Sequence, residues 1–375
     1  MKILIIRSFP TEIDIYKYNV QEIGLARSLV DKGNQCGIVL FTNSENRTEK
    51  YVLASGKEIT LYYRHGKNVL WQGFYNYKAI LDIASSYDAI QVNEYNQLLS
   101  YYMAKNCAKP CVIYHGPYYN PNDLKYNFLT KIFDSLFLRK YINIDVRVLT
   151  KSILAEDFLK KKGFKSVKTV GVGLDIERLE NVSTVGVDIA RDYHELLYVG
   201  EVSRRRNTIF LLDVLSRIKE RIPDIKLTII GKGSKEVEDN LTTQIEIKEL
   251  NNNIVWIKEV KQDELYKYYR RAGLFLFPTN YDIFGMVLLE TMFFGLPCIS
   301  SYNGGSETLL KDICEECIIM EISANKWCEK ACELLGDKTA WTDISIKEKE
   351  KIINHYTWDN IATEFIDAYE SFRKG

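Results

Sequence analysis

The sequence predicts an α/β protein built from two domains, each with a doubly wound parallel sheet and helices on both faces. The chain has 375 residues, and domains typically contain roughly 100 to 200 residues. Short runs rich in β-branched residues alternate with amphipathic stretches along the whole chain, which is typical of parallel strands connected by helices. With 46% apolar and 27% charged residues, the composition is that of a folded globular protein.

In the first half, apolar runs predict strands and amphipathic stretches predict the helices between them. The strands are expected at 2–7, 36–41, 59–63, 89–93, 111–115, 146–150 and 168–172. Helices are expected at 20–31, 97–107, 124–140 and 152–162, and the first and last of these end at Gly33 and Gly163. The periodicity fades over 175–193, which we expect to be a linker.

The alternation resumes in the second half. Strands are expected at 196–199, 226–230, 254–257, 274–277, 297–300 and 317–320, followed by a final pair of helices after residue 343. The domain boundaries are therefore expected at 1–175 and 176–356.

Charge and hydropathy exclude several classes of protein. Lys plus Arg and Asp plus Glu both number 50, so we expect no nucleic-acid partner. There is no early leader pattern and no apolar run of about 18 residues, so we expect a cytoplasmic protein without a membrane span. The segment 124–140 mixes apolar side chains with cations. It is either a core helix or a peripheral attachment to the anionic inner face of a membrane.

The eight cysteines mostly lie within apolar patterns, and we expect buried, reduced thiols. Cys314 and Cys317, and likewise Cys328 and Cys332, are spaced like zinc ligands. Core positions are favoured over a metal site, because Cys317 opens an apolar run and the later pair shares a helix face with Leu335.

The sequence lacks two common nucleotide motifs. There is no Gly-x4-Gly-Lys-Ser/Thr loop, and no Gly-x-Gly-x-x-Gly follows the first strand. ATP hydrolysis and nicotinamide chemistry are therefore disfavoured.

The most informative segment is 274–309. A predicted strand ends at Pro278, Asp282 lies in the loop that follows, and a helix is expected to begin near Phe284. Backbone N–H groups at the start of a helix can bind a diphosphate, and Gly285 lets a ligand approach the backbone closely. Glu290, further along the same helix, can accept hydrogen bonds from sugar hydroxyls. The simpler alternative makes Asp282 a helix cap and Glu290 a solvated residue.

Three other features are expected near a ligand. Gly304 and Gly305 follow the next strand at its carboxyl end, where ligands bind in open α/β sheets. His115 ends a strand of the first domain in the same way, and the alternative is a structural histidine. The run 204–206 consists of three arginines just before Asn207, which we expect to cap a helix over 208–221.

Cations beside the N-terminus of a helix are repelled by the partial positive charge there. An anionic ligand bound between them would offset this repulsion. We therefore interpret Arg206, and also Arg204, as diphosphate ligands. A solvated basic loop remains the alternative.

As a set, these motifs resemble the retaining glycosyltransferases of family 4. The resemblance implies the GT-B fold, in which two Rossmann-like domains face a central crevice. It rests on the acidic-x7-Glu motif at 282–290, and on the segments 170–175, 198–200, 295–297 and 304–307. The closing segment, 357–375, is similar to a family helix that packs back on the first domain.

The resemblance also implies roles for individual residues. Asp282 would bind hydroxyls of the donor sugar, Glu290 would bind the ribose, and His115 would contact the donor sugar. The family's Lys position falls on Arg206, while its Arg position falls on Glu201, which reverses the charge. Backbone and turn residues around the donor would be Phe284, Gly285, Met286, Gly200, Gly304 and Gly305.

The implied reaction is transfer of a sugar, with retention of configuration, from a UDP- or GDP-linked donor to a hydroxyl of a saccharide or lipid-linked acceptor. It would require no metal and no other cofactor, and it would serve cell-surface polysaccharide or glycolipid synthesis. Two alternatives stay open: a nucleotide-sugar epimerase of GT-B fold, and a catalytically silent partner subunit. Glu201 at an expected Arg position favours the second of these.

Overall fold

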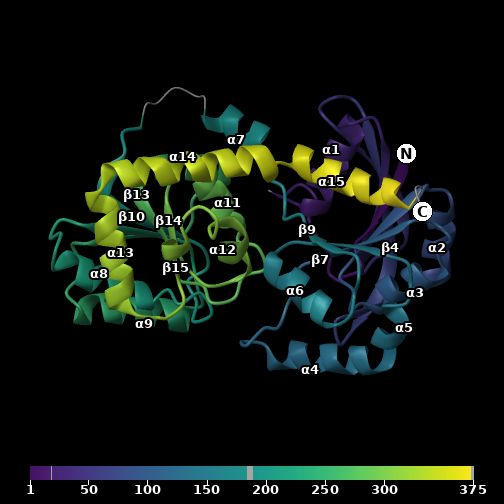
Figure 1. Cartoon of the computed structure of the whole chain (residues 1–375), viewed down its shortest axis with the longest axis horizontal. Coiled ribbons are helices and arrows are strands. Elements are labelled where there is room, and N and C mark those ends of the chain that lie inside the picture. Colours follow the sequence, from purple (N-terminus) through teal and green to yellow (C-terminus); the bar gives the residue numbers. More distant parts are fainter. Residues whose placement is uncertain (18, 184–188, 373–375) are drawn as a thin grey trace. The chain divides into compact units, whose positions relative to one another are not determined.

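The computed structural model describes residues 1–17, 19–183 and 189–372 (Figure 1). The chain divides into two compact units. Unit 1 consists of Met1–Gly173 and Thr357–Gly375, and unit 2 is Leu174–Tyr356. The predicted linker, 175–193, begins with helix α7 (Ile176–Ser183), and its residues 184–188 lie outside the described residues.

Unit 1 contains a largely parallel sheet with the strand order β3-β4-β2-β1-β6-β7-β8-β9. β3 runs antiparallel to β4, and β5 pairs antiparallel with the far end of β4. The sequence pattern did not predict β3, because its residues are mostly exposed and form no apolar run. The strands are β1 (Lys2–Ile6), β2 (Gln35–Thr42), β3 (Arg47–Val52), β4 (Glu58–Val69), β5 (Gln72–Tyr75), β6 (Ala89–Asn93), β7 (Cys111–His115), β8 (Arg147–Thr150) and β9 (Val167–Thr169).

The helices of unit 1 include the last helix of the chain, α15 (Trp358–Ser371), which packs against α1 (Gln21–Asp31). Gly24 and Gly173 make this packing close, because a Cβ at either would lie 2.3 or 2.4 Å from atoms of the Trp358 side chain. The other helical segments are α2 (Tyr77–Ser85), α3 (Leu98–Asn106), α4 (Leu124–Phe133), the π-helical segment η1 (Asp134–Leu138), α5 (Arg139–Tyr141) and α6 (Ile153–Lys161).

Unit 2 contains a parallel sheet with the order β12-β11-β10-β13-β14-β15. The strand order reverses between β10 and β13, and ligands of doubly wound folds bind outside the carboxyl ends of the strands at such a point. The predicted α/β class with two parallel sheets is confirmed. The strands are β10 (Asp192–Val199), β11 (Lys226–Ile230), β12 (Ile254–Ile257), β13 (Ala272–Phe277), β14 (Cys298–Ser301) and β15 (Ile318–Ile319).

The predicted cap at Asn207 is wrong. Helix α8 (Phe210–Lys219) begins later, with Ile209 at its N-cap position. Asn207 instead has a φ of 51°, and its side-chain Nδ2 donates a hydrogen bond to the Pro278 carbonyl at 2.9 Å. The other helical segments of unit 2 are α9 (Lys235–Ile247), η2 (Gln262–Glu264), α10 (Leu265–Arg271), α11 (Met286–Phe293), α12 (Gly304–Leu309), η3 (Glu315–Cys317), α13 (Ala324–Gly336) and α14 (Lys338–His355).

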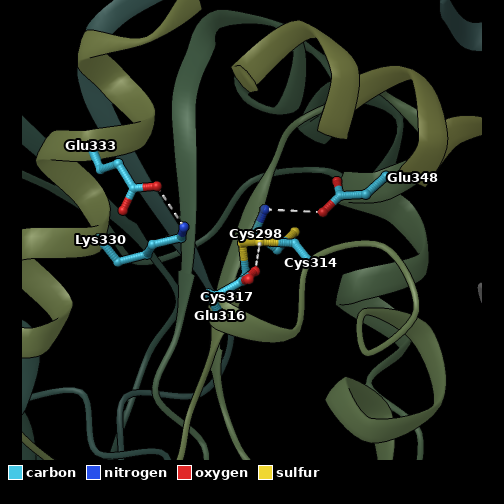
Figure 2. The surroundings of a disulfide bond; sticks show 7 residues. All are labelled: Cys298, Cys314, Glu316, Cys317, Lys330, Glu333 and Glu348. Carbon is cyan, nitrogen blue, oxygen red and sulfur yellow. Dashed lines mark hydrogen bonds and ion pairs between the residues drawn. A yellow bond between two sulfur atoms is a disulfide. The ribbon is translucent and has the colours of Figure 1, made fainter. Parts of the chain in front are cut away.

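The prediction of reduced thiols is wrong for Cys314 and Cys317, which form a disulfide (Figure 2). The turn at η3 holds their Cα atoms 5.3 Å apart, which is within bonding range, and two cysteines three positions apart suit a disulfide as well as zinc. Cys328 and Cys332 are free thiols with their sulfurs 3.9 Å apart. In the described part of the chain, no three His, Cys, Asp or Glu side chains are grouped to hold a metal.

Candidate functional site

Two loops meet where the strand order of unit 2 reverses. β10 and β13 are parallel neighbours, so the loop after β10 and the loop after β13 leave the same edge of the sheet. The first loop carries Arg206 and the second carries Asp282. Arg206 Nη1 lies 2.5 Å from Asp282 Oδ2 and 3.5 Å from Thr279 Oγ1. The fold thus brings together two residues that are 76 positions apart in the sequence.

Asp282 also binds the backbone at the start of α11. Its Oδ1 accepts hydrogen bonds from the N–H groups of Gly285 at 2.7 Å and Phe284 at 3.1 Å. These are two of the three backbone positions predicted to hold a diphosphate. The third, Met286, opens α11, where N–H groups lack partners within the helix. The Asp282 carboxylate therefore lies between the Arg206 guanidinium and the backbone N–H groups that precede α11.

The two glycine turns lie against each other. Gly285 has a φ of +75°, which favours glycine. A Cβ on Gly305 would lie 2.4 Å from the Phe284 carbonyl oxygen, so the backbones approach as closely as glycine allows. The Gly304 N–H donates to the Asp282 carbonyl at 3.1 Å. At the start of α12, the N–H groups of Gly305 and Ser306 donate to the Asn303 side chain.

Glu290 is buried on α11, with an exposed fraction of 5%. Its Oε2 accepts a hydrogen bond from the Tyr269 hydroxyl at 2.7 Å, and its Oε1 accepts one from Gln262 Nε2 at 3.4 Å. A buried carboxylate requires such partners, so the alternative of a solvated helix residue is wrong. The sequence did not indicate Tyr269 or Gln262, because no local pattern pairs the segment around α10 with α11.

The three consecutive arginines have different partners. Arg204 forms an ion pair with Glu236 at 2.8 Å, and both side chains are largely exposed. Arg205 pairs with Glu201 at 3.2 Å, so the reversed charge at position 201 is neutralised by its neighbour. Of these three, Arg206 is the one directed to Asp282. Its Nε is buried and has no hydrogen-bond partner among the described residues.

Gly200, at the end of β10, also lies where two backbones come close. Its carbonyl oxygen would be 1.8 Å from a Cβ on Gly231, which follows β11. Side chains are therefore excluded from this part of the sheet edge.

His115 lies in unit 1, fully buried at the carboxyl end of β7. Its Nδ1 is 2.6 Å from Glu94 Oε2, and Lys151 Nζ is 3.8 Å from Glu94 Oε1. Burial raises the pKa of the Glu94 carboxyl, but His115, Lys151 and the Gly116 N–H outweigh burial and hold that pKa below its ordinary value. Sequence reasoning missed Glu94, whose φ of +61° is its one unusual backbone feature. His115 Nε2 is buried without a hydrogen-bond partner among the described residues.

Comparison with protein families matches residues 186–350, most of unit 2, to the group 1 glycosyl transferases. Among curated relatives, an uncharacterized glycosyltransferase of Methanocaldococcus jannaschii is 26% identical over 185 residues, which cover 49% of this chain and 46% of the relative. Lipopolysaccharide 1,2-N-acetylglucosaminetransferase of Salmonella typhimurium is 27% identical over 194 residues, half of each chain. The aligned part thus spans about half the length of these relatives.

Solved structures match over the whole length. Sucrose-phosphate synthase from Thermosynechococcus elongatus has a TM-score of 0.73 at 15% identity, with 100% of both chains covered. Anabaena HepE in complex with UDP has a TM-score of 0.72 at 14% identity, covering 99% of this chain and 100% of that one. These similarities show the fold, two α/β domains with parallel sheets as in GT-B structures. The family match and the named relatives show similarity to glycosyl transferases over about half of the chain.

Proposed function

We propose that this protein is a retaining glycosyltransferase that moves a sugar from a nucleoside diphosphate donor to an acceptor hydroxyl. The observation that carries the proposal is the cluster at the reversal between β10 and β13. There, Arg206 and the start of α11 converge on one anion position. The UDP complex of the structurally similar HepE supports a nucleotide donor.

The leaving diphosphate gains negative charge as the glycosidic bond breaks. Arg206 and the backbone N–H groups of Phe284, Gly285 and Met286 supply fixed positive charge at the place where it develops. The Asp282 carboxylate contacts the same groups, so a bound diphosphate replaces it there. The released Asp282 carboxylate then accepts hydrogen bonds from hydroxyls of the donor sugar.

Two further residues complete the assignment. Glu290, held by Tyr269 and Gln262, binds the ribose hydroxyls through its remaining acceptor capacity. His115 offers its unpartnered Nε2 to a substrate hydroxyl, while Glu94 fixes the imidazole through Nδ1. The departing phosphate takes the acceptor proton on the same face of the sugar, so no protein nucleophile is assigned. Neither a metal ion nor another cofactor is required.

We also propose peripheral attachment to an anionic membrane surface, where a lipid-linked acceptor for cell-surface glycan synthesis would be found. Segment α4–η1 exposes an apolar stripe of Leu124, Phe128, Ile132 and Leu136, of which Phe128 is 63% exposed. Exposed cations flank it. Apolar side chains beside cations suit the interface of an anionic bilayer. None of the helices in the described part of the chain combines the length and apolar character needed to cross a bilayer.

The decisive experiment is a panel of UDP-, GDP- and ADP-linked sugars, scored for thermal stabilisation and for nucleotide release. A donor at 100 times its Kd stabilises a folded protein by about 2.7 kcal/mol. One nucleotide class should raise the melting temperature and be hydrolysed slowly without an acceptor. Conversion of the sugar without any acceptor would instead indicate an epimerase. No stabilisation by any donor or by free nucleotide would indicate a silent subunit.

A further inference from the structure

Unit 1 has its own reversal of strand order, between β1 and β6, and a pocket lies at that point. The pocket has a volume of about 180 Å³, which suits a single sugar ring. It is lined by Phe9, which follows β1, by Glu94 and Gln97, which follow β6, and by Trp71. All of its lining residues belong to unit 1. A doubly wound sheet offers a ligand site at this position.

An aromatic pair forms part of the wall. The rings of Trp71 and Tyr126 lie 5.7 Å apart, with an angle of 36° between their planes. Trp71 is in the two-residue turn that joins β4 to β5, since Val69 pairs with Gln72. Leu70 and Trp71 have φ angles of 50° and 65°. Asn and Gly are the residues that normally occupy such a turn.

The turn therefore holds a large aromatic residue in a conformation that such residues rarely adopt. Strained backbone of this kind concentrates at ligand sites. Glu94, on another wall of the same pocket, also has a positive φ of 61°. Two strained residues from separate segments thus line one small pocket, which indicates that the side chains there serve a ligand.

An unpartnered acceptor is the second, independent sign of a ligand. Gln97 is only 4% exposed, and its Oε1 has no hydrogen-bond partner among the described residues. Gln97 occupies the N-cap position of α3, but its side chain makes no capping bond. A buried carbonyl oxygen without a donor is destabilising, so a donor supplied by a ligand would satisfy it.

The chemistry of the lining defines the occupant. Aromatic faces pack against the C–H face of a sugar ring, while Gln97 Oε1 and the carboxylates of Glu94 and Asp123 accept hydrogen bonds from hydroxyls. The lining has these two acids and no Lys or Arg; Lys151, beside Glu94, is not among the lining residues. A phosphate or carboxylate group on the ligand would therefore be repelled.

We propose that this pocket binds an uncharged monosaccharide unit of the acceptor, with its ring on Trp71 and a hydroxyl on Gln97. The proposal rests on the transferase function proposed above and specifies its acceptor class: a neutral sugar rather than a sugar phosphate or a uronic acid. Trp71 and Gln97 are its specificity-determining residues.

The test measures binding directly, with the full chain and no donor. Methyl glycosides of glucose, galactose, mannose and N-acetylglucosamine, and the corresponding 6-phosphates, are titrated at millimolar concentration by saturation-transfer NMR. At least one neutral glycoside should bind, and its 6-phosphate should bind more weakly. Trp71→Ala and Gln97→Leu should each weaken binding by about tenfold, the cost of a lost aromatic contact or buried hydrogen bond.

Phe74→Ala is the matched control, because Phe74 is on the same hairpin, is 47% exposed and does not line the pocket. It should bind like the wild type. Gln97→Leu should also keep or raise the melting temperature, because it removes an unpaired buried acceptor. If Gln97 had only a structural role, its replacement would lower the melting temperature whenever it weakened binding. Weaker saccharide binding at an unchanged melting temperature therefore indicates a direct contact with the ligand.

Three results would overturn the proposal: no binding by any neutral glycoside, stronger binding of the 6-phosphates, or unchanged binding in both pocket variants. Nucleotide release and stabilisation by UDP report separately on unit 2. If saccharide binds but UDP neither stabilises the protein nor is released from a donor, the transferase function is refuted and the pocket proposal stands. If UDP stabilises the protein and is released from a donor but no saccharide binds, the pocket proposal alone is refuted.

Discussion

Arg204 and Arg206 are two positions apart and chemically identical, but their surroundings differ. Arg204 is paired with Glu236 in solvent, where ion pairs contribute little to stability. Arg206 is largely buried against Asp282 and keeps an unpartnered Nε. Fixed positive charge in a partly desolvated site stabilises developing negative charge far more than charge in water does.

We predict that Arg206→Ala lowers kcat by a hundredfold or more, because losing such a donor costs about 2.7 to 4 kcal/mol in the transition state. Arg204→Ala is the matched control and should stay close to wild type. Steady-state kinetics with the identified donor, together with thermal unfolding of both variants, provides the measurement. Equal losses in the two variants would show that general basicity, and not the geometry of Arg206, matters.

Glu290 tests the ribose assignment. The ribose does not change charge during transfer, so Glu290→Gln should weaken the ground state and the transition state equally. We expect KM for the donor to rise roughly tenfold or more, as for a lost hydrogen bond to a charged group, with kcat nearly unchanged. Tyr269→Phe, which frees the carboxylate from one partner, should shift KM in the same direction. A fall in kcat at constant KM would assign Glu290 to the chemical step instead.

Glu348 makes stability depend on pH. This side chain is fully buried on α14, and its Oε1 accepts a hydrogen bond from the Cys298 N–H at 3.3 Å (Figure 2). Burial raises the pKa of the carboxyl well above its ordinary value, although the Cys298 hydrogen bond partly opposes this. Above the ordinary carboxyl pKa of about 4.3, the unfolded chain loses this proton while the folded chain keeps it. Stability therefore falls as pH rises, until the folded-state pKa is passed.

We predict that Glu348→Gln is more stable than wild type at neutral pH and that its stability varies less between weakly acid and neutral pH. The amide keeps an acceptor for Cys298 but does not ionise. Urea unfolding of both proteins across this range measures the difference. If the variant were less stable than wild type at neutral pH, the buried carboxylate would be stabilising and this account would be wrong.

At the scale of single elements, the α4–η1 segment is unusual because several of its large apolar residues lie on the exposed side. Asn127, Thr130 and Phe133 face the unit and are buried, whereas Leu124 and Phe128 are exposed. The expectation of a core helix therefore fails for part of the segment: one side packs inward, and the other presents an apolar stripe to the surroundings.

We predict that the protein binds vesicles containing anionic lipid and that binding weakens as salt concentration rises. Replacing Phe128 and Leu136 with Ser should reduce this binding strongly, since each removes apolar area from the lipid contact. Ile247→Ser is the control, because Ile247 is 67% exposed on α9 of unit 2 and does not belong to this stripe. Cosedimentation with vesicles measures the binding of the wild type and of each variant. Salt-insensitive binding, or equal loss in the control, would contradict a role for this face.

At the scale of the whole molecule, the chain leaves unit 1 after Gly173 and re-enters it at Thr357. Trp358, Phe365 and Tyr369 of α15 are buried in unit 1, so its core contains residues from both ends of the chain. Each unit supplies its own polar groups at the carboxyl edge of its own sheet. These are Glu94 and His115 in unit 1, and Arg206 and Asp282 in unit 2.

We predict that turnover survives chelation. Arg206 and the first backbone N–H groups of α11 already supply the positive charge that a divalent ion would bring to the leaving diphosphate. Activity in EDTA, compared with activity after adding magnesium or manganese, is the measurement. Loss in EDTA that either ion restores would show that the leaving group depends on a metal.

The amino-acid sequence by itself determined most strands of the two sheets, because strands such as β7 and β13 are largely apolar runs in which every residue is buried. It also predicted that the turn at Gly304 and Gly305 converges with the loop of Asp282, whose carbonyl accepts a hydrogen bond from the Gly304 N–H. Tertiary structure alone decided β3, whose exposed edge position leaves no apolar signature. It also decided the partners of charged and polar side chains. Arg206 meets Asp282, Glu290 meets Tyr269, and Asn207 meets Pro278 rather than capping α8. The hydrophobic periodicity of the sequence indicates which face of a helix or strand is buried. It does not indicate which distant side chain contacts a given polar group.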